Sequence, residues 1–249
     1  MKRLQLIQEL FKLTTFDTYL EIGCYRGRTF FPVDAKRKIA VDPFFHLLFK
    51  KDAVLWVFKS FKNIRNRYFE LESDRFFKEK QSFLNSISAI DVALIDGLHT
   101  FETSLNDVIN TLNYLNRKGV IIMHDCYPPN KAAALATKHF PTKAEQEAVG
   151  GWTGAWCGDV WKTIVYLRRA HSDLLSACVI DTDNGLGIIR FKTNITSNTL
   201  LLNTDLYAEI DSMTYDDLIS DLKGLLDLQP KSYAFDLIKE VVNEVNGEA

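Results

Sequence analysis

The chain has 249 residues, of which 47% are apolar and 25% charged, and its formal net charge is −2. This composition is typical of a globular protein and excludes general disorder. The near-balanced charge gives no global reason to expect binding to nucleic acid or to an anionic membrane, although it leaves room for a local basic patch.

The N-terminal residues predict a short amphipathic helix. Leu4, Ile7, Leu10 and Phe11 recur at helical spacing, whereas a signal peptide would have a continuous apolar run. No stretch of 18 uninterrupted apolar residues occurs, so we expect no membrane span. The four cysteines lie far apart and form no C-x-x-C pair, so we expect reduced thiols in a cytoplasmic protein and no cysteine-based zinc site.

The first half of the chain alternates strand-like and helix-like segments. Between the last two predicted strands, apolar residues recur at three- and four-residue steps over residues 101–116, which predicts a helix with Gly119 just past its end. Such alternation indicates βαβ units and a parallel sheet. The predicted strands are residues 18–22, 38–41, 68–71, 91–95 and 120–123.

The second half begins with residues 127–157, which are rich in proline and glycine and which we interpret as a lid loop over the ligand crevice. A helix is expected over residues 158–169, with Asp159 as its cap. Strands at 176–181 and 186–191 are joined through Asn184-Gly185, a hairpin signal.

These elements predict an α/β fold: a Rossmann-like, doubly wound, seven-stranded sheet, mostly parallel, with a C-terminal antiparallel hairpin and helices on both faces. We expect one domain over residues 1–200 and a helical extension over 201–249 packed on it. The tail beyond Asp205 is the expected contact surface of a homodimer.

The segment that follows the first predicted strand, Glu21-Ile22-Gly23-Cys24-Tyr25-Arg26-Gly27, has the glycines of a ligand-binding turn that would open a helix. It is not the dinucleotide fingerprint G-x-G-x-x-G, because no glycine follows Gly23 at the second position. Asp42, 19 positions after Gly23, ends the next strand and can accept the hydroxyls of a ribose. An adenosine cofactor without a pyrophosphate fits this pattern, and the sulfonium of S-adenosylmethionine suits a site rich in carboxylates.

The order of several segments resembles the class I S-adenosylmethionine-dependent methyltransferases, and most closely the small-molecule and sugar O-methyltransferases. The segments are YLEIGCYRGRT, IAVDPF, ALIDGLHTFETSLNDV, GVIIMHDCYPP, GDVWKTIVYLR and DTDNGLGIIR.

The resemblance implies a role for each matching residue. Glu21, Gly23, Cys24 and Gly27 would form the cofactor loop, and Asp42 would hold the ribose. Further along the chain, Asp74 would lie near the adenine and Asp96 would also face the cofactor. Pro32 departs from the pattern, so we expect the first crossover helix to be shortened.

Four polar residues at predicted strand ends, Asp96, His99, His124 and Asp125, should face one crevice. In one hypothesis Asp96, Asp125 and His124 bind Mg²⁺, or Mn²⁺ if the imidazole is a ligand, and the metal orients an acceptor hydroxyl. Metal-dependent relatives of the family use acidic residues at comparable strand ends. In the other hypothesis His124 or His99 is a general base oriented by Asp125 or Glu102, and no metal takes part. His99 could also simply cap the following helix.

We therefore predict an O-methyltransferase that uses S-adenosylmethionine and acts on a small hydroxylated acceptor such as a sugar. Two alternatives remain open. One is a non-catalytic cofactor-binding protein with a methyltransferase fold, and the other is a nucleotide-dependent sugar-modifying enzyme. Nucleic acid is not an expected substrate, because Tyr127-Pro128-Pro129 reverses the order found in base-modifying methyltransferases.

Overall fold

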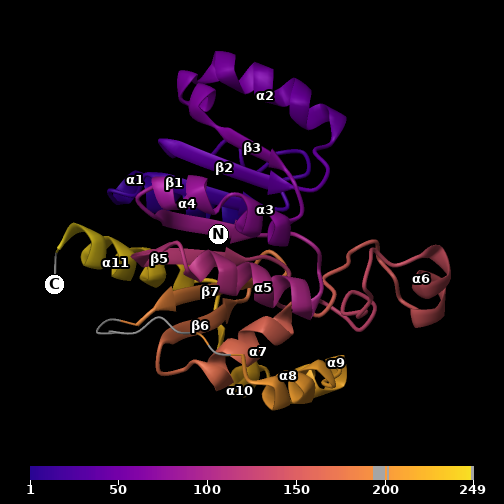
Figure 1. Ribbon diagram of the computed structural model, residues 1–249. Coiled ribbons are helices and arrows are strands. Elements are labelled where there is room, and N and C mark those ends of the chain that lie inside the picture. The colour runs from indigo at the N-terminus through magenta and orange to yellow at the C-terminus, as the bar shows by residue number, and fades with distance from the viewer. Residues whose placement is uncertain (193–199, 201, 248–249) are drawn as a thin grey trace.

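The computed structural model describes residues 1–192, 200 and 202–247, and these residues form an eight-stranded sheet flanked by helices (Figure 1). The strands lie in the order β3-β2-β1-β4-β5-β7-β6-β8. Their bounds are β1 Thr18–Ile22, β2 Arg37–Asp42, β3 Arg67–Glu70, β4 Ile90–Ile95, β5 Leu115–Met123, β6 Leu175–Ile180, β7 Leu186–Phe191 and β8 Leu228–Gln229.

The sheet is parallel from β3 to β5 and changes direction at β7. Strands β1, β2, β3, β4 and β5 pair in parallel, β7 runs antiparallel between β5 and β6, and β8 adds a short parallel edge to β6. The chain order reverses between β1 and β4, so the crevice at their carboxyl ends is the expected ligand site of an open α/β sheet. The doubly wound fold with a C-terminal antiparallel hairpin is confirmed, with β8 as an addition to the seven predicted strands.

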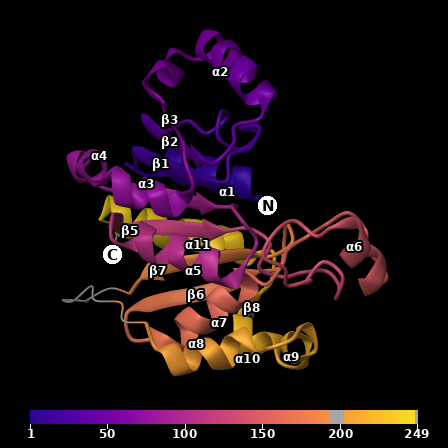
Figure 2. The ribbon, with the colours of Figure 1, turned by 45° about the vertical axis from the view of Figure 1, so that its right-hand side comes forward.

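Helices cover both faces of the sheet, as the two views show (Figure 2). Side chains of α1 and α11 pack on the face formed by Val92, Leu94, Val120 and Ile122, and those of α5 and α7 pack on the opposite face. The bounds are α1 Arg3–Leu13, α2 Leu47–Lys59, α3 Ser73–Glu79, α4 Gln81–Ser86, α5 Phe101–Leu112, α6 Lys143–Val149, α7 Trp161–Ala170, α8 Thr204–Asp211, α9 Tyr215–Ser220, α10 Leu222–Leu226 and α11 Tyr233–Asn246, with the 3₁₀-helix η1 at Phe61–Arg65.

The prediction that Gly119 ends a helix is wrong. Helix α5 ends at Leu112, and Gly119 lies inside β5, which already begins at Leu115. A Cβ atom at Gly119 would lie 2.8 Å from the carbonyl oxygen of Asp91 on β4. The glycine is therefore required by the close approach of two strands and not by a helix terminus.

The crossover between β1 and β2 contains no helix, shortened or otherwise, in residues 23–36, all of which are described. Lys38 is buried, and its Nζ donates to the carbonyl oxygens of Phe30 at 3.1 Å and Phe31 at 2.9 Å. Carbonyls that accept from a buried lysine in this way help to hold the loop, and Pro32 lacks the N–H that a helix interior needs.

Asp159 does not cap α7, whose N-cap residue is Val160. Its Oδ1 instead accepts from the backbone N–H of Phe101 at 2.7 Å, and its Oδ2 lies 3.1 Å from Lys162 Nζ. Asp159 therefore joins the start of α7 to the start of α5. Trp161, the first residue of α7, is buried in the core.

The C-terminal residues contribute to both faces of the sheet. Ile210, Leu218 and Leu226 belong to the core on the α5 side, and Leu237 and Val241 belong to the core on the α1 side. The domain boundary expected near residue 200 falls beside residues 193–199 and 201, which lie outside the described part of the chain. Within the described residues, no helix combines the length and the apolar character needed to cross a membrane.

Candidate active site

The carboxyl ends of β1, β4 and β5 are aligned by backbone hydrogen bonds that continue past the strands. The N–H of Asp96 donates to the carbonyl of Ile22 at 2.9 Å, and the N–H of His124 donates to that of Ile95 at 3.0 Å. Gly23, with a φ of +85°, lies so close to β4 that a Cβ atom would be 1.9 Å from the Asp96 carbonyl oxygen. Sheet register thus brings the glycine turn, Asp96 and His124 to one edge.

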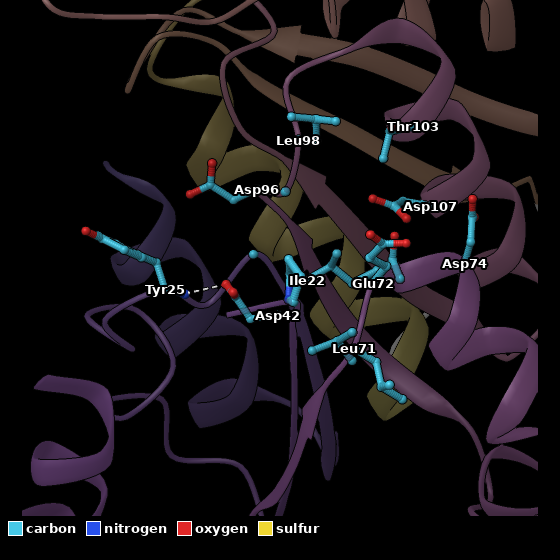
Figure 3. Close-up of a pocket in the computed structure, with 15 residues that line it drawn as sticks. Ile22, Tyr25, Asp42, Leu71, Glu72, Asp74, Asp96, Leu98, Thr103 and Asp107 are labelled. Carbon is cyan, nitrogen blue, oxygen red and sulfur yellow. Dashed lines mark hydrogen bonds between the residues drawn. The ribbon is translucent and has the colours of Figure 1, made fainter. Parts of the chain in front are cut away.

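A pocket of about 540 Å³ opens at this edge (Figure 3). Tyr25 and Asp96 lie at one end of the view, and Asp74 and Asp107 lie at the other. The volume suits a nucleoside-sized ligand. The full lining is Ile22, Gly23, Tyr25, Val41, Asp42, Pro43, Leu71, Glu72, Ser73, Asp74, Asp96, Gly97, Leu98, Thr103 and Asp107.

Asp42 lies at the end of β2, as predicted, and its carboxylate organises the neighbouring backbone. Oδ2 accepts from the N–H of Tyr25 at 2.7 Å and Oδ1 accepts from the N–H of Phe44 at 2.8 Å. Burial raises the pKa of Asp42, while these two N–H groups act in the opposite direction. Each oxygen keeps a second lone pair, so the carboxylate can still accept from ligand hydroxyls.

A smaller pocket of about 190 Å³ adjoins the first and shares Gly23, Tyr25 and Asp96 with it. Glu21 lines this smaller pocket, and its Oε2 accepts from the Tyr19 hydroxyl at 2.6 Å. Burial raises the pKa of Glu21 to about 8. A carboxyl held in this way gains from a cationic group placed beside it.

Cys24 and Gly27, both predicted to belong to the cofactor loop, lie in different surroundings. Cys24 lines the smaller pocket, and its Sγ donates to the carbonyl of Glu21 at 3.3 Å. Gly27 lines neither pocket: its φ is +68°, and a Cβ atom there would meet the Phe31 ring at 2.4 Å. Gly27 is thus a turn residue that permits close packing of Phe31.

Asp107 lines the pocket and was not singled out in the sequence. It lies on α5 with only 1% of its surface exposed, and its Oδ1 has no hydrogen-bond partner among the described residues. Burial raises the pKa of Asp107 to about 7. The sequence did contain a signal that Asp107 is buried. Asp107 falls in the same helical stripe as Ser104, Val108 and Thr111, which faces the interior.

The four predicted strand-end residues do form one cluster. His124 Nδ1 lies 3.0 Å from Asp125 Oδ2 and 3.2 Å from Asp96 Oδ1. His99 Nε2 lies 3.5 Å from Asp96 Oδ1, and its Nδ1 lies 3.5 Å from Asp125 Oδ2. His99 does not cap α5, because Thr100 is the N-cap residue and accepts from the N–H of Thr103.

The charged groups in this cluster shift one another's pKa values. Burial lowers the pKa of His124, but Asp125 and Asp96 outweigh it and raise that pKa to about 9. Burial likewise lowers the pKa of His99, and Asp96 and Asp125 raise it further than burial lowers it. Burial works against ionisation of Asp96, yet His124 and His99 hold its pKa well below the usual range. The two carboxylates therefore favour a cation between them.

Asp125 is held in an unusual backbone conformation, with a φ of +61°. Its Oδ1 accepts from Asn184 Nδ2 at 3.0 Å and from Cys157 Sγ at 3.4 Å. These contacts leave Oδ2 directed to the two imidazoles. Backbone strain maintained by the surroundings is common where a functional side chain must be aimed.

Arg3 and Asp183 complete the cluster from distant parts of the chain. Arg3 Nη1 lies 2.8 Å from Asp183 Oδ2 and 2.6 Å from His124 Nε2, and its Nη2 lies 3.7 Å from Asp96 Oδ2. No role was predicted for either residue: Arg3 starts an amphipathic helix, and Asp183 lies in the hairpin turn of DTDNGLGIIR, a segment that resembles the family.

The donor set of Asp96, His124 and Asp125 fits a divalent metal ion. One ligand atom from each residue lies within 4.8 Å of the others. In an octahedral site with bonds of about 2.1 Å, neighbouring ligand atoms are about 3 Å apart. His124 Nδ1 is buried and forms no hydrogen bond with a described residue despite its two close carboxylates. An imidazole nitrogen with two carboxylates suits Mn²⁺ better than Mg²⁺.

The predicted lid approaches the cluster through His99 and Trp156. The Nδ1 of His99 is 2.7 Å from the carbonyl oxygen of Trp156, to which it can only donate, and the two rings lie 5.2 Å apart. Gly158 passes so close that a Cβ atom would lie 1.8 Å from the His99 carbonyl oxygen. Trp156 is nearly buried, and Phe140 and Trp152 pack edge to face beyond it.

Comparison with known proteins agrees with the expected family. Residues 20–126 match the model of a methyltransferase domain. The SAH-bound methyltransferase PaMTH1 from Podospora anserina has a TM-score of 0.53 and 16% identity over 77% of this chain and 80% of its own. The O-methyltransferase TomG from Streptomyces achromogenes, solved in complex with SAM, has a TM-score of 0.50 and 14% identity over 76% and 79%.

A search among curated proteins gave no match to the chain. At these identities the solved structures show the fold alone, and the match to a methyltransferase domain covers residues 20–126, less than half of the chain. The predicted resemblance to the class I S-adenosylmethionine-dependent methyltransferases is thus confirmed over residues 20–126 and in the fold.

Proposed function

Because residues 20–126 match a methyltransferase domain on a class I methyltransferase fold, we propose that the chain transfers a methyl group from S-adenosylmethionine to a small hydroxylated acceptor such as a sugar. One observation carries the proposal: Asp96 lines both pockets and also belongs to the cluster of acids and imidazoles. A cofactor in the pockets would thus have its reactive end beside groups able to orient and deprotonate a hydroxyl.

Different pocket residues would contact different parts of the cofactor. Asp42 would accept from the ribose hydroxyls, for which its free lone pairs are suited. Glu21 would face the amino group of the methionine part, where a cation relieves its unfavourable burial. Asp74 and Asp107, at the other end of the pocket, would face the adenine, whose amino group is a donor for carboxyl oxygens.

The cluster would prepare the acceptor. Asp96, Asp125 and His124 would hold a divalent metal, which when bound lowers the pKa of a hydroxyl and orients it. His99 would take the hydroxyl proton on Nε2, since its Nδ1 already donates to Trp156. The acceptor oxygen then forms the new C–O bond, the S–CH₃ bond breaks, and the sulfur keeps the electron pair.

The lid would shape the acceptor site. Residues 127–157 follow β5 directly, and the backbone carbonyl of Trp156 holds His99. Trp152, which packs against the exposed Phe140 ring, offers a flat apolar surface of the kind that sugars and aromatic rings contact. Water would be excluded from the transfer step as the acceptor fills the space between lid and cluster.

Calorimetric titration with S-adenosylmethionine tests cofactor binding, and transfer of labelled methyl to a panel of hydroxylated sugars tests the reaction. Wild type is expected to bind the cofactor, and His99→Gln is expected to bind it equally well while losing at least about a hundredfold in kcat. Absence of cofactor binding in wild type would overturn the proposal. Binding without transfer to any hydroxylated acceptor would favour the non-catalytic alternative.

A further inference from the structure

The three consecutive elements α2, η1 and β3 form the outer end of the molecule and carry a charge unlike that of the whole chain. Between Leu47 and Glu70 there are six lysines or arginines and two acidic residues, a formal charge of +4 in a chain of −2. Strand β3 is the edge of the sheet, and α2 stands beyond it, away from α8 and α9 in both views (Figures 1 and 2).

The outward stripe of α2 is apolar where a solvated helix would be polar. Val54, Leu55 and Phe58 are 59%, 49% and 78% exposed and follow one another at helical spacing. Lys51 lies on the same exposed side one turn before these residues, and Lys59 is exposed immediately after them at the flank of the stripe, where its Nζ lies 4.5 Å from the centre of the Trp56 ring. Scattered exposed apolar residues need no explanation, but a stripe of them rimmed by lysines marks an interaction surface.

The opposite side of α2 is fixed to the body by aromatic packing. The rings of Phe45 and Phe49 stack 4.3 Å apart, Phe49 lies 4.9 Å from Phe31, and Trp56 stacks on Phe31 at 6.2 Å. Because its inner side is anchored, α2 cannot rotate to bury Val54, Leu55 and Phe58 without breaking this packing. The apolar stripe is therefore a lasting feature of the surface.

The apolar and basic character continues beyond α2. Ile64 on η1 is 64% exposed, and Arg65 and Arg67 are exposed beside it. Phe44, which is 63% exposed, lies between the wall of the cofactor pocket and the start of α2. Within the described residues, Arg65 and Arg67 have no acidic partner, so their charge is available to an anionic surface.

We propose that the face formed by α2, η1 and the start of β3 docks on the surface of an anionic lipid bilayer. The apolar side chains of Val54, Leu55, Phe58 and Ile64 would enter the headgroup boundary, and the surrounding lysines and arginines would pair with lipid phosphates. A helix lying in the interface has this combination of aromatic and aliphatic residues with a basic rim. Each basic group near such a surface adds to the attraction.

The positive charge of this face favours an anionic bilayer over a second copy of the chain as its partner. Two copies joined through this face would bring like charges of +4 together, which opposes association. The face lies next to the pocket entrance through Phe44 and Pro43, so docking would present the candidate active site toward the membrane. The inference does not depend on the proposed methyl transfer, because the surface residues lie outside both pockets.

Flotation of the purified full chain with vesicles tests the inference. We expect binding to vesicles of phosphatidylcholine with 30% phosphatidylglycerol at 0.1 M salt, and at least about tenfold weaker binding to pure phosphatidylcholine, because several basic groups are attracted to the anionic surface. Leu55→Ser/Phe58→Ser and, separately, Lys51→Glu/Lys59→Glu should each lower the bound fraction by about tenfold or more.

Matched controls separate this face from general stickiness. Phe235→Ser removes an aromatic ring that is 56% exposed on α11, and Lys231→Glu/Lys239→Glu reverses two exposed charges near it. Both controls should bind as wild type does, and all variants should keep the wild-type unfolding temperature. The inference is overturned if wild type ignores anionic vesicles, if Leu55→Ser/Phe58→Ser binds undiminished, or if light scattering shows that this face joins two copies instead.

Discussion

The Nη1 atom of Arg3 lies 2.6 Å from Nε2 of His124, a contact that joins the start of the chain to the end of β5. A guanidinium only donates, so this contact is a hydrogen bond only when Nε2 accepts, which requires the neutral ring with its proton on Nδ1. It therefore opposes the imidazolium form that Asp125 and Asp96 favour. Metal ligation by Nδ1 requires the other tautomer, with the proton on Nε2. The Arg3 contact and a metal at His124 therefore exclude each other.

Asp183 is the partner that the metal-binding tautomer would use. Its Oδ2 lies 3.8 Å from His124 Nε2 and 2.8 Å from Arg3 Nη1. When Arg3 leaves, Nε2–H can donate to Asp183, as the second nitrogen of a metal-bound histidine commonly does to a carboxylate. Arg3 and the metal are thus alternative cations for the same carboxylates.

Removal of Arg3 should therefore strengthen metal binding. Arg3→Ala removes one positive charge and frees Nε2, so we expect the Kd for Mn²⁺ to fall by about tenfold. Asp183→Asn should raise it by about tenfold or more, because the histidine loses its orienting acceptor. Electron paramagnetic resonance of free Mn²⁺ measures both.

The control for this prediction is Lys12→Ala, which removes a positive charge from the same helix at a site 69% exposed and should leave the Kd unchanged. Asp125→Ala should abolish binding. Equal Mn²⁺ affinity in wild type and Arg3→Ala would show that the two cations do not compete.

Asp42 should control affinity for the ribose. Replacement by Ala removes an acceptor for ligand hydroxyls, and we expect the Kd for S-adenosylhomocysteine to rise by about tenfold to a hundredfold, as for a lost hydrogen bond to a charged group. Because Asp42 also holds the N–H groups of Tyr25 and Phe44, the loss could arise from the loop itself. The 2′-deoxy form of S-adenosylhomocysteine distinguishes the two causes. Its Kd should change much less between wild type and the Asp42→Ala variant, and an equal loss of affinity for both ligands would contradict the ribose role.

The central part of the sheet was predictable because β1, β2, β4 and β5 contain short buried runs with charged residues at or near their carboxyl ends. Asp42, Asp96 and Asp125 could be placed at one edge for that reason, since parallel strands share a polarity. The predicted ends of helices and strands were wrong where a contact with a distant part of the chain determines the local structure. Gly119 reads locally as a helix end but is required by the approach of β4.

Other features depend on contacts between residues far apart in the chain. Arg3 and Asp183 meet across 180 positions, and no local pattern can indicate such a pair. The outer face of α2 was also not predictable from periodicity, because the helix has apolar residues on all sides and its exposed stripe emerges only once Phe49 and Trp56 are seen to be packed. The role of Asp107 depends likewise on the pocket that α3 and β4 create around it.

The close approach to His99 of Gly158, the residue that follows the lid, should make the stability of the protein far more sensitive to substitution at Gly158 than at Gly154. Both have a positive φ, +59° and +88°, so replacement by Ala strains the backbone at both positions. A Cβ atom at Gly158 would lie 1.8 Å from the His99 carbonyl oxygen, whereas at Gly154 nothing lies within 4 Å. Chemical denaturation should show Gly158→Ala less stable than Gly154→Ala by at least about 2 kcal/mol. Similar values for the two variants would mean that the lid does not pack on His99 in solution.

Burial of Asp107 should make the stability of the protein fall as the pH rises. Its pKa is raised from the usual value of 3.8 to about 7, mainly by burial, so the folded state binds the proton more tightly than the unfolded chain. The stability linked to this proton is fully present below pH 3.8 and is lost as the pH rises through about 7. Asp107→Asn removes the titration, so wild type should lose up to about 4 kcal/mol relative to the variant between pH 4 and pH 8. Urea denaturation at both pH values measures the difference, and parallel pH profiles for the two proteins would show that Asp107 is solvated or ionised in the native pocket.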